Sequence, residues 1–243
     1  MSQTLKNWVF YAFLLLESVL YVLILTDNKL PNNIICYISI VLGVITMGVM
    51  FCKNKNWLLM LVGMIFTLVA DTFLVLLNGV HKDIAMVAFN IAQICYLIKI
   101  WCDIDNKRIN IISLIVRIVL TVGVELAAVL ILKQDYSFLI CVSTMYFANL
   151  FVNVIFSFFK SNIYFSIGLI LFTMCDLTIG FQFLCELFNI TSGWFYNLAY
   201  TNFNLTWMFY LPSQLLIVTS QYVTSRKMSR QKVDNQQVSN IDA

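Results

Sequence analysis

The sequence predicts an all-α integral membrane protein, with eight transmembrane helices built as two four-helix repeats of the same orientation. Three observations predict this class: the composition, a series of long apolar runs, and a phrase that occurs twice around an aspartate. Of the 243 residues, 61% are hydrophobic and 11% are charged, and the mean hydropathy is +0.87. A soluble domain typically has about 25% charged residues, so this composition indicates a chain that is surrounded by lipid.

The apolar runs are each about 20 residues long, which is the length of helix that crosses a bilayer. They are continuously apolar rather than alternating, so they predict helices and not the strands of a barrel. No loop between them is long enough for a soluble domain, so we expect one transmembrane domain over residues 1–243. In order, the predicted spans are residues 8–26, 34–52, 57–78, 84–102, 111–132, 138–159, 164–185 and 203–224.

The loop charges predict the orientation. Eight crossings put both ends of the chain on one side, and that side carries eleven basic residues against three on the other. Because cytoplasmic loops are enriched in Lys and Arg, we expect both termini in the cytoplasm of a bacterium and the spans in its plasma membrane. The basic tail, residues 225–243, is expected to anchor on anionic headgroups. The net charge of +3 thus indicates membrane lipids as partners, and nothing in it suggests nucleic acid.

Two aspartates lie inside the third and seventh apolar runs, each at the end of a similar phrase. Asp71 ends the phrase Gly-Met-Ile-Phe-Thr-Leu-Val-Ala-Asp, and Asp176 ends the phrase Gly-Leu-Ile-Leu-Phe-Thr-Met-Cys-Asp. A carboxylate at bilayer depth costs roughly 2.5 kcal/mol or more, so such a residue usually faces a polar cavity and has a function there. Asp71 and Asp176 are therefore the candidate catalytic residues.

The two phrases are 105 residues apart, which indicates a duplication with halves at about 8–102 and 111–224. Each half would contain four crossings, so the two copies run in the same direction and are related by an axis along the bilayer normal. From the rise per residue of a helix, Asp71 and Asp176 lie roughly 21 Å and roughly 18 Å along their helices. We therefore expect the two carboxylates to face each other across a shared cavity.

Other polar residues in the spans follow helical spacing. Thr67 and Asn78 share a helix face with Asp71, and Pro212 is expected to kink the eighth span because it has no amide hydrogen. Such stripes serve either as substrate contacts or as hydrogen bonds that hold helices together, and the spacing alone leaves both interpretations open. The candidate substrate-binding residues are Asn90, Gln93, Tyr96, Tyr146, Asn149, Tyr210 and Gln214.

Glu17, Arg117 and Glu125 also lie within the predicted spans. Arg117 and Glu125 share one stripe of the fifth span, where we expect a structural pair or side chains that reach toward the helix ends; Arg117 is otherwise a candidate phosphate partner. Glu17 suits a cavity and a structural contact equally well. The single histidine, His81, cannot supply a His-rich zinc site, and no nucleotide-binding motif occurs. We expect neither a metal nor a cofactor.

Four blocks of the sequence resemble, in order along the chain, the YhhN family of integral membrane proteins, which includes the lysoplasmalogenases. The blocks are Gly63–Leu74, Phe89–Tyr96, Phe172–Ile179 and Tyr210–Ile217. Together with the eight-span layout, they extend the resemblance over nearly the whole chain.

The resemblance implies hydrolysis of the vinyl ether bond of a lysoplasmalogen, which gives a fatty aldehyde and a glycerophospho-alcohol. A lysophospholipid is then the substrate. The bond is cleaved by proton transfer to its β-carbon, and water captures the oxocarbenium ion that forms. The reaction needs one protonated acid and one carboxylate, and two aspartates in a low-dielectric cavity can supply both forms. Which aspartate has which role is left open.

The chain also departs from the family. The family usually has glycine where this chain has Ala70, serine where it has Cys175, and histidine where it has Gln93. The last departure matters most, because glutamine forms hydrogen bonds but cannot titrate. Two alternatives to the enzyme are therefore kept. One is a proton-coupled small-molecule transporter, since duplicated bundles with buried acids are typical of transporters. The other is a non-catalytic lysolipid-binding protein.

Overall fold

The computed structural model describes residues 3–26, 31–50, 55–77, 79–104, 106–200 and 205–241. These residues form helices joined by short links, and they contain no strand. The long helices are α1 (Gln3–Leu25), α2 (Asn32–Val49), α3 (Lys55–Asp71), α4 (Lys82–Asp103), α5 (Lys107–Leu132), α6 (Phe138–Lys160), α7 (Ile163–Leu187) and α9 (Leu205–Ile241). The short ones are the π-helix η1 (Thr72–Leu76), the 3₁₀-helix η2 (Lys133–Asp135) and α8 (Trp194–Ala199).

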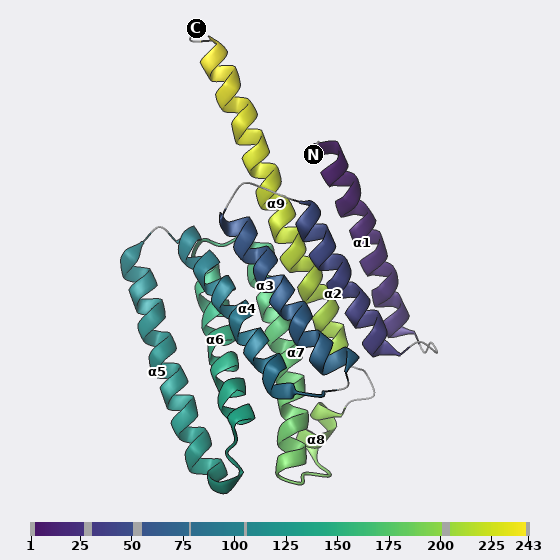
Figure 1. The fold of residues 1–243 in the computed structure, drawn as a ribbon, viewed down its shortest axis with the longest axis vertical. Helices are drawn as coiled ribbons and strands as arrows, with labels where there is room; N and C mark the ends of the chain where they lie inside the picture. The colour runs from purple at the N-terminus through teal and green to yellow at the C-terminus, as the bar shows by residue number, and fades with distance from the viewer. Residues whose placement is uncertain are drawn as a thin grey trace.

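Successive long helices run in alternating directions and pack side by side (Figure 1). Helix α1 begins and α9 ends at the same end of the bundle, called the termini end below; the opposite end is the far end. In the described part of the chain, seven helices are long and apolar enough to cross a membrane, namely α1 to α7 with η1 continuing α3. The prediction of an all-helical membrane protein is thus confirmed.

The eighth predicted span corresponds to the first part of α9. This helix is continuous through Pro212 and does not stop at the predicted span boundary near residue 224. Residues 225–241, predicted as a basic tail, extend the same helix beyond the neighbouring helices (Figure 1). No Gly or Pro follows Pro212 in the sequence, so no helix breaker ends α9 earlier.

The closest helix pairs are α3 with α4 and α7 with α9. Helix α6 packs on α4 and α7, and α2 packs on α3 and α9, so these six helices form the interior of the bundle. Helices α1 and α5 lie at the outside, against α2 and α9 and against α6 respectively. Few of their residues are buried, and the remaining surface is largely exposed and apolar, as on helices that face lipid.

Glycines allow the two closest pairs to approach. A Cβ at Gly63 would lie 2.6 Å from Cε1 of the fully buried Tyr96 in α4. A Cβ at Gly168 would lie 3.1 Å from the carbonyl oxygen of Ser213 and 3.3 Å from the backbone nitrogen of Ile217, both in α9. The two glycines that begin the repeated phrases are therefore helix-packing residues, as small residues are in many transmembrane interfaces.

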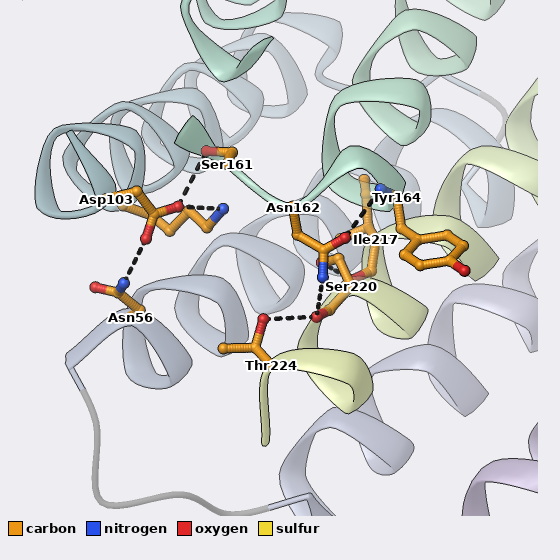
Figure 2. A network of polar contacts seen from close by, with 9 residues as sticks. Asn56, Asp103, Ser161, Asn162, Tyr164, Ile217, Ser220 and Thr224 are labelled. Atoms are coloured by element: carbon orange, nitrogen blue, oxygen red, sulfur yellow. Dashed lines mark hydrogen bonds and ion pairs between the residues drawn. The ribbon is translucent and has the colours of Figure 1, made fainter. Parts of the chain in front are cut away.

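One polar cluster at the termini end joins the starts of the two aspartate-bearing helices (Figure 2). Asp103, the last residue of α4, accepts a hydrogen bond from Nδ2 of Asn56 in α3 at 2.7 Å. It accepts another from Oγ of Ser161, just before α7, at 3.0 Å, and it pairs with Nζ of Lys99 at 2.8 Å. Because α3 and α7 share this anchor, their interior residues are held at related depths.

Asn162 joins the start of α7 to α9 in the same region (Figure 2). Its Oδ1 accepts a hydrogen bond from the backbone amide of Tyr164 at 3.1 Å, which caps the helix. Its Nδ2 donates to the carbonyl oxygen of Ser220 at 3.2 Å. The α7–α9 pair is thus fixed at the same end of the bundle as the α3–α4 pair.

The third predicted span, residues 57–78, corresponds to one helical segment that changes from α- to π-helix directly after Asp71. The α-helix ends at Asp71 and η1 follows, with the Leu77 amide donating to the Thr72 carbonyl, five residues back, at 2.9 Å. Hydropathy cannot distinguish a π turn from an α turn, because both are equally apolar here. Such turns often occur at functional sites. Asn78, expected on the face of Asp71, lies outside the described residues.

Candidate active site

Asp71 and Asp176 both lie in the interior of the bundle. Asp71 is the last residue of α3 and its exposure is 4%. Asp176 lies within α7 and is half-buried. Their hydrogen-bond partners, Tyr210 and Tyr146, are linked through ring contacts of Phe172 and Phe89, so both acids lie in one region of the interior. That the two carboxylates face each other across a shared cavity stays a prediction.

Each aspartate accepts a hydrogen bond from a tyrosine on another helix. The hydroxyl of Tyr210 in α9 donates to Oδ2 of Asp71, and the hydroxyl of Tyr146 in α6 donates to Oδ2 of Asp176. Both tyrosines are buried. The sequence predicts them as substrate contacts, whereas the structure makes them direct partners of the two acids. Each bond fixes one carboxylate oxygen and leaves Oδ1 as the second oxygen of that acid.

Four aromatic rings connect the two tyrosine–aspartate pairs. Phe172 of α7 packs edge-on against Phe89 of α4, with ring centroids 5.9 Å apart, and against Tyr210, with centroids 6.0 Å apart. Phe89 in turn lies 5.3 Å from the ring of Tyr146. The chain Tyr146–Phe89–Phe172–Tyr210 thus forms an aromatic wall, buried in the bundle, that links the two tyrosine–aspartate pairs.

The residues that precede the acids are small and buried. Ala70 and Cys175 are both buried, and so is Cys36 of α2. Among the described residues, no group of three or more His, Cys, Asp or Glu side chains could hold a metal ion. The acids therefore lie among weakly polar and aromatic groups, where electrostatic interactions are stronger than in water.

A second polar cluster surrounds Arg117, the buried cation of α5. Its Nη1 donates to Oδ1 of Asn149 at 2.5 Å and to the carbonyl oxygen of the same residue at 3.3 Å. Its Nη2 donates to Oδ1 of Asn153 at 2.9 Å. Asn149 and Asn153 are four residues apart on α6 and so present their amides on one face. That spacing is visible in the sequence, although the identity of the partner helix is not.

Asn90 and Gln93 of α4 complete this cluster. Nδ2 of Asn149 donates to Oδ1 of Asn90 at 3.2 Å. Nδ2 of Asn153 donates to both the carbonyl oxygen and Oε1 of Gln93 at 2.9 Å. Three of the predicted substrate-binding residues, Asn90, Gln93 and Asn149, are thereby brought into one network. Asn153, which joins them, was not among the candidates.

The expected pairing of Arg117 with Glu125 is wrong. Oε1 of Glu125 accepts from the hydroxyl of Thr144 at 2.5 Å, and its Oε2 accepts from the hydroxyl of Tyr136 at 2.7 Å. Eight residues separate Arg117 from Glu125, which is more than two helical turns, or about 12 Å. Each side chain therefore bonds the neighbouring helix α6 at its own level.

Glu17 has a structural partner. Its Oε2 accepts a hydrogen bond from Oγ of Ser39 in α2 at 2.8 Å, and its exposure is 2%. Of the two interpretations of this residue, the contact supports a link between α1 and α2.

Tyr96 and Gln214 lie in helix–helix contacts nearer the termini end. Tyr96 covers Gly63 and packs edge-on against Phe165, with ring centroids 5.6 Å apart. Gln214 is 1% exposed, and its Nε2 lies 3.4 Å from Oγ of Ser213, beside the Gly168 contact. Both positions suit helix packing, and their role in substrate binding stays a prediction.

A bundle of long apolar helices with two acids in its interior defines an all-α membrane protein with a polar site at membrane depth. The sequence model of the YhhN family matches residues 33–221 of this chain, and the chain belongs to that family. The match extends from α2 into α9 and includes both acids and the Arg117 cluster. No curated protein and no solved structure matches the chain.

Proposed function

We propose that this protein is an intramembrane hydrolase that cleaves the vinyl ether bond of lysoplasmalogens, with Asp71 and Asp176 as general acid and general base. The products are a fatty aldehyde and a glycerophospho-alcohol. The observation that carries the proposal is the pair of acids, each bonded to its own tyrosine and linked through the aromatic wall, inside a bundle of the YhhN family.

The chemistry requires one protonated and one ionised carboxyl group. The protonated acid transfers its proton to the β-carbon of the vinyl ether, which leaves an oxocarbenium ion at the α-carbon. The ionised carboxylate takes a proton from water as the water oxygen adds to the α-carbon. When the hemiacetal breaks its bond to the glycerol oxygen, the protonated base gives its proton to that oxygen, and the hemiacetal hydroxyl returns a proton to the first acid as the aldehyde forms. One water is consumed and no net proton. A pair of close carboxyl groups suits this cycle because they avoid carrying two negative charges at once.

Tyr146 and Tyr210 act as positioning residues in this mechanism. Their hydroxyl groups hold Oδ2 of the two acids, so Oδ1 of each acid is oriented for proton transfer. Geometry of this kind contributes to catalysis by keeping the reacting atoms in a near-attack arrangement. The aromatic wall of Phe89 and Phe172 supplies an apolar surface for the alkenyl chain, and ring faces near the α-carbon stabilise the positive charge that develops there.

Proton transfer in this protein is assigned to the aspartates alone. Gln93, which replaces the histidine that the family resemblance leads one to expect, accepts a hydrogen bond from Asn153 and so has a neutral, bridging contact. We propose that the polar part of the substrate site is lined by Asn90, Gln93 and Asn149. The end of the site nearer the termini is closed by Tyr96 and Gln214.

We also propose that the bundle consists of two four-helix repeats, α1–α4 and α5–α7 with α9. The packing of α3 on α4 is matched by that of α7 on α9. In each proposed repeat, the glycine of the repeated phrase contacts a residue that lies three positions after a glutamine: Gly63 contacts Tyr96, and Gly168 contacts Ile217. The glutamines are Gln93 and Gln214, and each is preceded by an aromatic residue four positions earlier. With the basic residues concentrated on the termini side, both termini are assigned to the cytoplasm.

Aldehyde release tests the function. Purified protein in detergent is given a vinyl-ether lysophospholipid or its saturated alkyl-ether analogue, and the aldehyde is quantified. Wild type is expected to release aldehyde from the vinyl ether alone, and Asp71→Asn and Asp176→Asn to lose about 10²- to 10⁴-fold in rate. Glu17→Gln is the matched control, because it neutralises a buried carboxylate that bonds Ser39 rather than a tyrosine of the site; its rate should equal wild type. Full activity in either aspartate variant would exclude the two-acid mechanism.

The π turn after Asp71 favours one alternative, a proton-coupled transporter. Buried acids in membrane bundles bind protons in transporters, and Asp71 lies where α3 passes into a π turn, a geometry often found at functional sites. Solute uptake into proteoliposomes that depends on a pH gradient, without aldehyde release, would support that alternative. Binding of lysolipid with neither uptake nor aldehyde would indicate a non-catalytic lipid-binding protein.

A further inference from the structure

Arg117 is a buried cation without a carboxylate partner. It lies on the inner face of α5 with an exposure of 7%, and its hydrogen bonds go to the neutral oxygens of Asn149 and Asn153. Its Nε is buried and has no hydrogen-bond partner. In the described part of the chain the side-chain ion pair is Lys99 with Asp103, and Glu125 bonds Thr144 and Tyr136 instead.

A charge of this kind is costly in a membrane interior unless an anion compensates it. Asn149 and Asn153 orient the guanidinium through Nη1 and Nη2 but carry no negative charge. The Nε edge is left for a further acceptor. Guanidinium groups bind phosphate through adjacent N–H groups, often in a bidentate manner. Since no carboxylate of the described residues pairs with Arg117, an anion from outside the chain suits its Nε edge.

The Arg117 cluster lies next to the acids along α6. Tyr146, Asn149 and Asn153 follow one face of that helix, so the amides lie about one and two turns, roughly 5 and 10 Å, from the tyrosine that bonds Asp176. Helix α4 also connects the two places. Its Phe89 contacts the ring of Tyr146, and the next residue, Asn90, accepts a hydrogen bond from Asn149 of the Arg117 cluster. In a lysoplasmalogen, the glycerol backbone separates the vinyl ether from the phosphate by a length of the same order as one helical turn.

We propose that Arg117, oriented by Asn149 and Asn153, binds the phosphate group of the lysolipid substrate and thereby places its vinyl ether beside Asp71 and Asp176. This inference rests on the proposed hydrolase function. The site selects phosphate-bearing vinyl ethers over alkenylglycerols that lack the phosphate. Because Arg117 touches the phosphate and not the reacting carbons, it is a substrate-binding residue and acts mainly on KM.

The test compares two vinyl ethers that differ in the phosphate: a lysoplasmalogen and the corresponding 1-alkenylglycerol. Wild type should favour the phosphate-bearing substrate by about 10- to 100-fold in kcat/KM, the range of charge-assisted hydrogen bonds. Arg117→Gln should remove this preference by raising KM for the lysoplasmalogen, so that kcat/KM becomes similar for the two substrates. Arg117→Lys keeps the charge without the planar fork and should retain part of the preference. Equal losses on both substrates, or no preference in wild type, would overturn the proposal and leave Arg117 a helix-packing residue.

Binding separates this proposal from the catalytic one. The non-cleavable alkyl-ether lysophospholipid and the corresponding alkylglycerol are added to Asp71→Asn protein, and the rise in melting temperature is measured. The phosphate-bearing lipid should stabilise the protein more, and Arg117→Gln in the same background should cancel the difference. If no vinyl ether releases aldehyde but this Arg117-dependent binding is found, the phosphate site stands and the hydrolase function fails. If the variants do not fold, competition between the two alkyl ethers in wild-type protein decides: equal affinities would overturn the phosphate site.

Discussion

Tyr210 on α9 donates its hydroxyl hydrogen to Oδ2 of Asp71 on α3, and so ties the last long helix to the acid beside the π turn. The second acid has an equivalent but not symmetric arrangement, because Asp176 is bonded by Tyr146 of α6. In the proposed pair of repeats, Phe89 of α4 corresponds to Tyr210 and has no hydroxyl group. The two acids thus receive the same type of donor from helices that would occupy different places in the two proposed repeats.

Removing either hydroxyl should slow catalysis without unfolding the protein. Tyr210→Phe and Tyr146→Phe each delete one hydrogen bond to a carboxyl oxygen and keep the ring in the aromatic wall. We expect kcat for aldehyde release to fall by about 10- to 100-fold, as for the loss of a hydrogen bond to a charged group. Steady-state kinetics on the vinyl-ether lysolipid measures this change.

Tyr222→Phe is the matched control for these variants. Tyr222 is a buried tyrosine of the same helix α9, but its hydroxyl donates to Oδ1 of Asn7 in α1 at 3.0 Å. Its kcat should equal that of wild type. A comparable loss in all three variants would mean that tyrosine hydroxyl groups support the bundle in general rather than the acids.

The two aspartates should behave as one unit. If one donates the proton and the other accepts one from water, removal of either stops the same cycle, and removal of both adds little. We expect the Asp71→Asn/Asp176→Asn double variant to be no slower than the slower single variant, as is found for groups that act together. Additive losses in log kcat would show that the acids work in independent steps.

The sequence predicts much of this architecture because membrane helices have a strong one-dimensional signal. Seven spans lie within a few residues of the observed helices, and both aspartates lie in the interior region that their matching depth predicts. The hydrogen-bond partners on other helices are not predicted, because they depend on how each helix is rotated about its axis. For this reason the sequence predicts Tyr146 and Tyr210 as substrate contacts and not as partners of the acids. It likewise predicts a pair of Arg117 with Glu125 on the same helix, whereas the structure pairs Arg117 with amides of α6. The π turn has no hydropathy signature at all.

The repeated glycines should be essential for stability. Gly168→Ala places a Cβ 3.1 Å from a backbone oxygen of α9, which cannot move without shifting that helix, and Gly63→Ala places one 2.6 Å from the buried Tyr96 ring. Each should lower the free energy of unfolding by about 1–3 kcal/mol, as for other overpacked sites. Thermal unfolding in detergent measures the effect.

Gly123→Ala and Gly180→Ala are the controls for the glycine variants. A Cβ at either position meets no atom within 4 Å, so no clash arises, and the better helix propensity of alanine adds up to about 1 kcal/mol. Destabilisation by these changes as well would mean that glycine flexibility, rather than close packing, matters in these helices.

The Lys99–Asp103 pair should stabilise the termini end of the bundle. Lys99 is 7% exposed, and its ammonium lies 3.9 Å from the ring centroid of Phe165 as well as 2.8 Å from Asp103. Asp103→Asn leaves this buried charge unpaired, which should cost about 3 kcal/mol. The double variant Lys99→Met/Asp103→Asn removes both charges and should recover part of the loss. A double variant less stable than Asp103→Asn alone would show that the lysine contributes mainly through its contact with Phe165.

Gln93→His restores the residue that the family resemblance leads one to expect and tests whether a titratable group is needed there. Gln93 is fully buried and accepts a hydrogen bond from Nδ2 of Asn153, and a neutral imidazole nitrogen can accept the same bond. Because the aspartates carry both proton transfers in the proposed mechanism, we expect kcat within about threefold of wild type and a pH–rate profile of the same shape. Gln93→Met removes the acceptor and serves as the packing control. A contrary result would be a large gain in rate in the histidine variant, with a new limb in the pH–rate profile between pH 6 and 7. It would mean that a histidine at this position takes part in proton transfer. The chain with Gln93 would then be adapted to another reaction or to binding alone.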